Sequence, residues 1–153
     1  MYPRKGTALL RKGRYSERNR IYHLTTATYQ RVPIFKNLLL GRCVVRALMR
    51  QHQDGHIESL AFVVMPDHLH WLLQLRSGRT LGVCMNLVKS LSAREISQHC
   101  GQRGSVWQRG YHDRALRKED DVVRIARYII ANPLRSGLVD SIRQYPLWDA
   151  KWV

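Results

Sequence analysis

Residues 57–75, IESLAFVVMPDHLHWLLQL, decide the fold of this chain. The first part of this stretch is apolar enough for a central strand, and the last part alternates between two faces as a second strand does. Between them, Met65-Pro66-Asp67 favours a tight turn, because proline lacks a backbone donor and aspartate can bond its own backbone. We therefore predict a β-hairpin formed by strands 57–65 and 68–75.

The sequence on both sides of this hairpin completes a regular pattern. Runs of β-branched and aromatic residues predict strands, and apolar residues at helical spacing predict helices. The remaining predicted elements are strand 22–29, helix 36–53, helix 80–101, strand 106–116 and helix 119–131. The order is β-α-β-β-α-β-α, an α+β class. Its first six elements match a ferredoxin-like arrangement, a four-stranded antiparallel sheet with two helices on one face. The last helix is an addition.

The first 20 residues differ in character from the rest. They have little periodicity, and they carry one acid and seven basic residues, namely Arg4, Lys5, Arg11, Lys12, Arg14, Arg18 and Arg20. This composition predicts a flexible basic arm that binds DNA phosphates, or a terminus without a specific partner. Because 153 residues correspond to one compact domain, we predict a single folded domain over residues 21–153.

The charge of the chain points to a polyanionic partner. Lys and Arg number 26 against 11 acids, which gives a net charge of +15. Twenty of these cations are arginine, whose planar and always charged guanidinium matches phosphate oxygens. Nucleic acid is the commonest polyanion that a folded protein binds. A basic protein with a merely well-solvated surface is the less favoured alternative.

The same sequence argues against membrane and secreted classes. No apolar run approaches the roughly 20 residues of a membrane span, and the apolar patch Ala8-Leu9-Leu10 is too short for a signal peptide. Cys43, Cys84 and Cys100 are odd in number and lack metal-site spacing. We interpret them as reduced thiols and expect a cytoplasmic protein with no membrane partner.

A His-x-His pair opens the second strand of the hairpin. Residues two apart on a strand point to the same face, so His68 and His70 should project together, while Leu69, Trp71, Leu73 and Leu75 fill the opposite face. Two neutral imidazoles side by side form half of a metal site. A hydrogen-bonded pair without metal is the alternative.

A second constellation lies in the last predicted helix. Tyr128 and Asn132 are four residues apart, so a helix would stack the hydroxyl and the amide on one face, with Arg124 one turn earlier. The alternative is a surface tyrosine and an asparagine that ends the helix before Pro133.

Together these motifs resemble a specific family. Residues 64–70, VMPDHLH, resemble the His-hydrophobic-His strand of HUH nucleases. Residues 127–139, RYIIANPLRSGLV, resemble the tyrosine helix of REP-associated tyrosine transposases, relatives of the single-tyrosine transposases of small insertion sequences. Segments 22–26 and 107–113 are also similar, and the resemblance covers roughly residues 20–148.

The resemblance implies a metal-dependent nuclease and strand transferase. It implies Mg²⁺ or Mn²⁺ held by His68, His70 and Asn132, with Tyr128 as the nucleophile. The insertion-sequence relatives typically carry glutamine where this chain has Asn132. The implied substrate is single-stranded DNA from a hairpin-forming palindromic repeat. REP-associated relatives can act as monomers, so a monomer is favoured over a homodimer.

The residues themselves make this chemistry reasonable. Two imidazoles and an amide bring no negative charge to a metal ion, so a DNA phosphate could supply it. A tyrosine that attacks phosphorus forms a 5′-phosphotyrosine and conserves the phosphodiester energy for rejoining. Arg124 and Arg127 are candidates to assist loss of the phenol proton and to bind DNA. Tyr111, on a predicted strand, is the rival nucleophile.

Two other functions stay open at this stage. One is a non-catalytic module that binds single-stranded nucleic acid, and the other is a metal-dependent RNA nuclease without a covalent intermediate.

Overall fold

The computed structural model describes residues 16–101, 104–117 and 120–152. Along the chain, its strands and α-helices are β1 (Ile21–Ala27), α2 (Leu38–Gln53), β2 (Ile57–Met65), β3 (His68–Leu75), α3 (Leu81–Cys100), β4 (His112–Ala115), α4 (Val122–Ile130), α5 (Asn132–Arg135) and β5 (Trp148–Ala150). Short 3-10 segments lie at Tyr29–Arg31, Ile34–Lys36 and Ile142–Gln144.

The strands form one antiparallel sheet in the order β4-β1-β3-β2-β5. The predicted hairpin is confirmed, because β2 and β3 pair from Ile57↔Leu75 to Met65↔His68. The α+β class is also confirmed. The sheet has a fifth strand beyond the four predicted, since Ala61↔Ala150 and its neighbours pair β5 with the free edge of β2. With three residues, β5 is too short to leave a periodic signal in the sequence.

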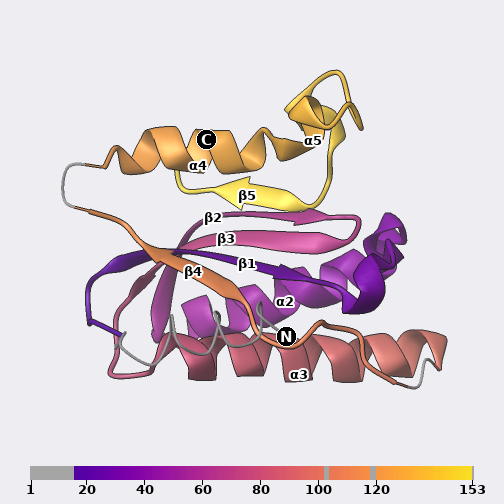
Figure 1. Ribbon diagram of the computed structural model, residues 1–153, viewed down its shortest axis with the longest axis horizontal. Coiled ribbons are helices and arrows are strands. Elements are labelled where there is room, and N and C mark those ends of the chain that lie inside the picture. The colour runs from indigo at the N-terminus through magenta and orange to yellow at the C-terminus, as the bar shows by residue number, and fades with distance from the viewer. Residues whose placement is uncertain (1–15, 102–103, 118–119, 153) are drawn as a thin grey trace.

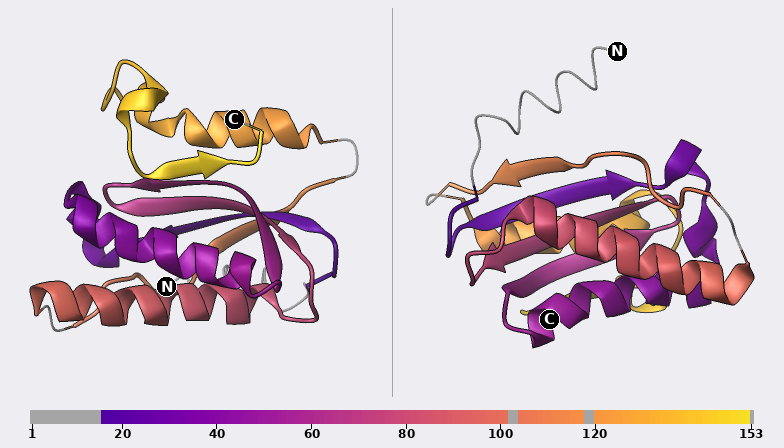
Figure 2. Two further views of the ribbon diagram at one scale, coloured as in Figure 1. Left: turned by 180° about the vertical axis from the view of Figure 1, so that it is seen from behind. Right: turned by 90° about the horizontal axis from the view of Figure 1, so that it is seen from below.

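The sheet lies between two helical layers of unequal size. Figures 1 and 2 show α2 and α3 side by side on one face and α4 on the other. Leu69, Trp71, Leu73 and Leu75 of β3 enter the core shared with α2 and α3, as predicted, whereas Leu72 enters the core beneath α4. Each fully buried side chain of this size contributes about 1.5–3 kcal/mol of transfer free energy. Odd and even positions of β3 therefore face different layers.

The helix that carries Tyr128 begins later than predicted. Its N-cap is Asp121, whose Oδ1 accepts the N–H of Arg124 at 3.1 Å, and the first helical residue is Val122. A carboxylate that caps a helix stands just before the first turn, where it satisfies a backbone donor. Asp120 and Asp121 therefore precede the helix.

The predicted strand 106–116 is also shorter in the structure. Trp107 makes only an isolated bridge to Thr28, and its indole N–H donates to Ser92 Oγ at 2.9 Å in the core beside α3. The ladder with β1 then covers residues 112–115. Trp107 is thus a buried residue of the core shared with α2 and α3.

The segment predicted as an arm divides into two parts. Residues 1–15, and with them five of the seven basic residues, lie outside the described residues. Residues 16–20 contact the folded domain: Ser16 Oγ accepts the N–H of Leu81 at 2.9 Å, and the Arg18 guanidinium donates to the carbonyl of Arg76 at 2.9 Å. The last residues of the predicted arm therefore belong to the domain.

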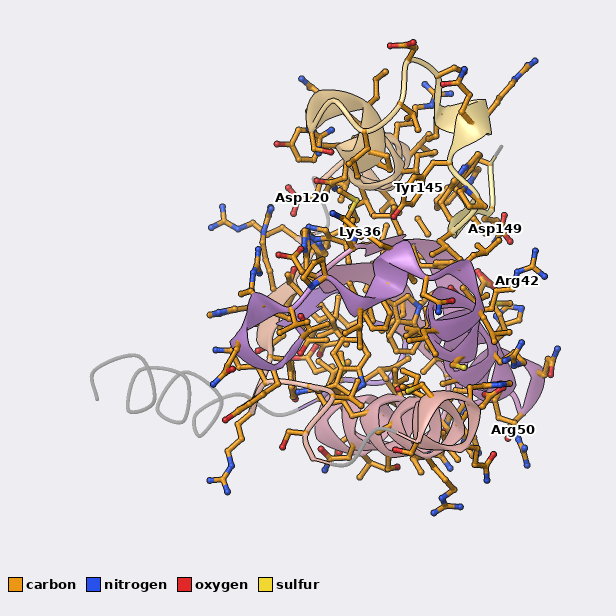
Figure 3. The ribbon with its side chains drawn as sticks, turned by 90° about the vertical axis from the view of Figure 1, so that its right-hand side faces the viewer. Lys36, Arg42, Arg50, Asp120, Tyr145 and Asp149 are labelled. Atoms are coloured by element: carbon orange, nitrogen blue, oxygen red, sulfur yellow. The ribbon has the colours of Figure 1, made fainter. Side chains whose placement is uncertain are left out.

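The C-terminal segment is held against β2 by Tyr145. Figure 3 shows Tyr145 between the upper layer and the strands. Its hydroxyl donates to the carbonyl of Val64 at 2.5 Å, and burial raises the pKa of Tyr145 to about 12.

Among the described residues, no helix combines the length and apolar character needed to cross a membrane.

Candidate active site

The two histidines of β3 lie on the sheet face that α4 covers. They alternate with the residues of the larger core and share their face with Leu72, which packs beneath α4. Their ring centroids are 5.0 Å apart, in an edge-to-face arrangement. The predicted projection of His68 and His70 toward one side is therefore confirmed.

The ring of His68 is held by the turn residue before it. Its Nδ1 lies 2.7 Å from Asp67 Oδ1, and Asp67 Oδ2 lies 3.1 Å from Arg31 Nε. An ionised carboxylate only accepts hydrogen bonds, so Nδ1 of His68 is the donor and Nε2 carries the lone pair of the neutral ring. Arg31 reaches Asp67 from a turn in which both Gln30 and Arg31 have left-handed backbone, with φ of 55° and 57°. Such strained residues concentrate at functional sites.

The ring of His70 contacts β1, the neighbouring strand. Its Nδ1 lies 3.0 Å from His23 Nε2 and 3.2 Å from Thr25 Oγ1. Burial, and after it positive charge on His23, His68, Arg135 and Arg31, lowers the pKa of His70 to about 3. His70 is therefore a neutral imidazole at neutral pH, the form that binds metals. No role was predicted for His23, which joins the site only through the pairing of β1 with β3.

The Nε2 atoms of His68 and His70 fit a divalent metal ion as ligands. Within the described residues, neither His68 nor His70 uses Nε2 in a hydrogen bond, while both Nδ1 atoms have partners. Metal-binding histidines usually show this division, with one ring nitrogen on the metal and the other on an orienting group.

Asn132 lies just beyond the C-terminal end of α4, at the start of α5. Pro133 has no N–H to donate to the carbonyl of Ile129, and the Asn132 Nδ2 donates there instead, at 2.8 Å. The predicted helix end before Asn132-Pro133 is confirmed, with Ala131 as the C-cap. Capping and ligand binding are compatible, because the hydrogen bond uses the amide nitrogen and leaves Oδ1 for a metal.

Tyr128 is exposed and lies against an arginine from α5. Its side chain is 64% exposed, and the Cζ of Arg135 lies 3.6 Å from the centroid of its ring. The Arg135 guanidinium also donates to the Tyr128 carbonyl at 2.6 Å. The charge of Arg135 is also one of the causes of the lowered pKa of His70. Arg135 had no predicted role, because its contact with Tyr128 depends on the turn between α4 and α5.

Comparison with known proteins identifies the family. The profile of the family described as "Transposase IS200 like" matches residues 16–132. The chain belongs to this family. The match begins at Ser16, the first residue that the structure describes, and ends at Asn132.

Two curated relatives are similar to this chain over 99 and 130 residues. An Escherichia coli REP-associated tyrosine transposase is 25% identical over 130 residues, covering 84% of this chain and 68% of that protein. A Haemophilus influenzae protein, provisionally named a REP-associated tyrosine transposase, is 25% identical over 99 residues, covering 58% of this chain. The alignment spans 56% of that relative's length.

A solved structure shares the fold. It is described as a REP-associated tyrosine transposase bound to a REP hairpin, and it matches with a TM-score of 0.69 and 22% identity. The match covers 88% of this chain and 79% of that one.

The other candidate residues of this IS200-like transposase occupy different environments. Arg20 pairs with Glu17 at 3.2 Å, while Arg124 and Arg127 are exposed on α4. In the described part of the chain, neither of these two arginines stacks on the Tyr128 ring, where Arg135 takes that position. Tyr111 packs against the core of α2 and α3, near Gly82. The rival tyrosine therefore lies on the sheet side opposite the histidine pair.

A second group of potential ligands lies between α2 and α3. Ligand atoms of Cys43, Glu95 and His99 lie within 4.8 Å of one another. Arg46 already donates to both Glu95 and Cys43, and burial raises the pKa of the Cys43 thiol. The guanidinium of Arg46 thus already supplies the positive charge at this place, and the Cys43 thiol stays protonated. We therefore interpret the group as an ion-pair network that joins α2 and α3.

Proposed function

We propose that this IS200-like transposase is a metal-dependent endonuclease and strand transferase for single-stranded DNA. Its substrate would be hairpin-forming repeat DNA, and a ferredoxin-like core would carry the site. One observation supports the proposal most: His68, His70, the Tyr128–Arg135 pair and Asn132 all belong to the α4 side of the sheet.

Mg²⁺ or Mn²⁺ would be held by His68 Nε2, His70 Nε2 and Asn132 Oδ1. When bound, the ion would act as a Lewis acid on the scissile phosphate. The neutral donor set leaves the negative charge to the DNA, so metal and substrate should bind together.

Tyr128 would act as the nucleophile. The phenol gives up its proton, its oxygen bonds to phosphorus, and the bond from phosphorus to the 3′-oxygen breaks. The 3′-oxygen takes up a proton, which leaves a 5′-phosphotyrosine and a free 3′-hydroxyl. Attack by a 3′-hydroxyl reverses these steps and rejoins the strand. The Arg135 guanidinium over the ring would orient the side chain.

The DNA partner is supported by charge and by the relatives. The net charge is +15, and a protein with the same fold was solved with a REP hairpin. Single-stranded substrate also suits a small site, because exposed bases and a flexible backbone can bend into it. We propose that the protein acts as a monomer, since one chain holds all the proposed catalytic groups.

A labelled hairpin oligonucleotide with divalent metal tests the reaction. We expect a protein–DNA adduct that survives denaturation and carries the DNA on the 3′ side of the cut, joined through its 5′-phosphate. Binding without cleavage would favour the non-catalytic module. Cleavage of an RNA hairpin without an adduct would favour the RNA nuclease.

The basic arm should determine much of the salt dependence of DNA binding. Deleting residues 1–15 removes five positive charges, at Arg4, Lys5, Arg11, Lys12 and Arg14, and spares the contacts of residues 16–20. For every phosphate that the arm no longer neutralises, the slope of log affinity against log salt should flatten by about 0.7 for single strands. Fluorescence anisotropy with a labelled hairpin at several salt concentrations measures this slope.

A variant with glutamine at the same five positions is the control for chain length. It should show the same flattened slope, and both variants should still form the adduct at saturating DNA. If both keep the wild-type slope, the phosphate contacts lie on the folded domain, with Arg18, Arg20, Arg124 and Arg127 as the next candidates.

A further inference from the structure

We propose that His23 is a positioning residue that selects the coordinating nitrogen of His70. The inference rests on the proposed function, because it takes His70 as a metal ligand. His23 would accept a hydrogen bond from Nδ1 of His70, so that Nε2 of His70 presents its lone pair to the metal.

The sheet places these two rings together. β1 and β3 are neighbours, with Thr25 opposite His70 and His23 opposite Leu72. Tyr22 and Leu24 enter the core of α2 and α3, so His23 points to the other face, where the histidine pair lies. The ring centroids of His23 and His70 are 5.2 Å apart and the planes are tilted by 37°.

The contact between the two rings is a hydrogen bond, so only one of the two facing nitrogens carries a proton. His23 Nε2 and His70 Nδ1 are 3.0 Å apart, a hydrogen-bond distance at which one nitrogen donates and the other accepts. If His70 accepted, its own proton would sit on Nε2 and would block coordination there. Coordination through Nε2 therefore requires His70 to donate and His23 to accept.

Thr25 does not determine which nitrogen of His70 carries the proton. Its hydroxyl lies 3.2 Å from the same Nδ1, but a hydroxyl can donate or accept and so suits both proton positions. A neutral imidazole in water prefers its proton on Nε2, so the form that coordinates through Nε2 needs a dedicated acceptor at Nδ1. His23 is that acceptor, as Asp67 is for His68.

The two side chains that contact the Nδ1 atoms of His68 and His70 differ in charge. Asp67 is an anion paired with Arg31, whereas His23 is a half-buried imidazole opposite Arg114 of β4. A neutral acceptor orients His70 without adding negative charge to the site. This matches a donor set that leaves the charge of the metal to the DNA phosphate.

Nitrogen-15 NMR of the histidine rings in the metal-free full chain tests the tautomer. We expect the proton of His70 on Nδ1, with a bare Nε2, in the wild type. In His23→Phe, which keeps a ring of similar shape without nitrogens, we expect the proton to move to Nε2. A wild-type His70 protonated on Nε2 would overturn the inference, whether or not the protein cuts DNA.

Mn²⁺ binding provides the second readout, measured by electron paramagnetic resonance of free Mn²⁺ with hairpin DNA in a Tyr128→Phe background that should not cut. His23→Phe should weaken Mn²⁺ binding by about 10–100-fold. His23→Gln, whose Oε1 can accept from Nδ1, should stay within a few-fold of the parent. DNA affinity without metal should be unchanged in both.

His56→Gln is the matched control, because His56 precedes β2 at the opposite end of the hairpin and bonds Ser77. It should bind Mn²⁺ like the parent. If His23→Phe is folded and does so too, His23 has no positioning role and the proposed function stands. If the parent, the Tyr128→Phe variant with no second substitution, binds no Mn²⁺, the proposed function fails. The NMR result alone then decides the role of His23.

Discussion

Tyr128→Phe is expected to remove the covalent protein–DNA adduct and strand cleavage, while hairpin binding and folding persist. The substitution deletes one oxygen, the atom that would attack phosphorus. Loss of a nucleophile should lower the cleavage rate by on the order of 10⁴-fold or more. Because the side chain is 64% exposed, the free energy of unfolding should change by less than about 0.5 kcal/mol. Denaturing gels with labelled hairpin DNA measure the adduct.

Tyr111→Phe is the matched control for this experiment. Tyr111 packs on the opposite side of the sheet, so its variant should form the adduct at the wild-type rate. An adduct that persists in Tyr128→Phe and disappears in Tyr111→Phe would contradict the assignment of the nucleophile.

His68→Ala and His70→Ala should each reduce cleavage by on the order of 10³-fold or more, which corresponds to about 4 kcal/mol of transition-state stabilisation. EDTA should have the same effect on the wild type, and added Mg²⁺ or Mn²⁺ should restore cleavage. Since His68, His70 and Asn132 bring no negative charge, the free protein should bind metal weakly and bind it better once DNA is present. Calorimetric titration with and without hairpin DNA measures this difference.

A histidine outside the site controls for the loss of any imidazole. His52 of α2 accepts the N–H of Ser59, away from the histidine pair, and His52→Ala should cut normally. Tight metal binding by the free protein, unchanged by DNA, would contradict the proposed ligands. So would full cleavage in EDTA.

Local sequence patterns predicted the central hairpin and the helices α2, α3 and α4, but not the face of the sheet that α4 covers. Alternation in residues 68–75 distinguished the face of Trp71 from the face of His68, because a strand has a period of two. Strand β5 left no such signal. Its three residues pair with β2 only because Tyr145 and Leu147 hold the segment there.

The site was predictable where it depends on neighbours in sequence. The shared face of His68 and His70 follows from strand spacing, and the choice of Tyr128 and Asn132 follows from helix spacing together with the family resemblance. His23 and Arg135 do not, because one depends on the register of β1 against β3 and the other on the chain direction after Pro133. Contacts that tertiary structure creates carry no local pattern.

The two helical layers should also differ in local stability. The α2–α3 side buries a large core, whereas α4 is a nine-residue helix whose buried residues are Ala126, Ile129 and Ile130. Helices with few buried apolar contacts open at lower free-energy cost than the global transition. Amide hydrogens of α4 should therefore exchange with solvent sooner than those of α3 or β3, which mass spectrometry after deuterium labelling can measure. The proposed nucleophile and Asn132 would then belong to a cooperative unit separate from His68 and His70, free to shift between cleavage and rejoining while the sheet stays intact.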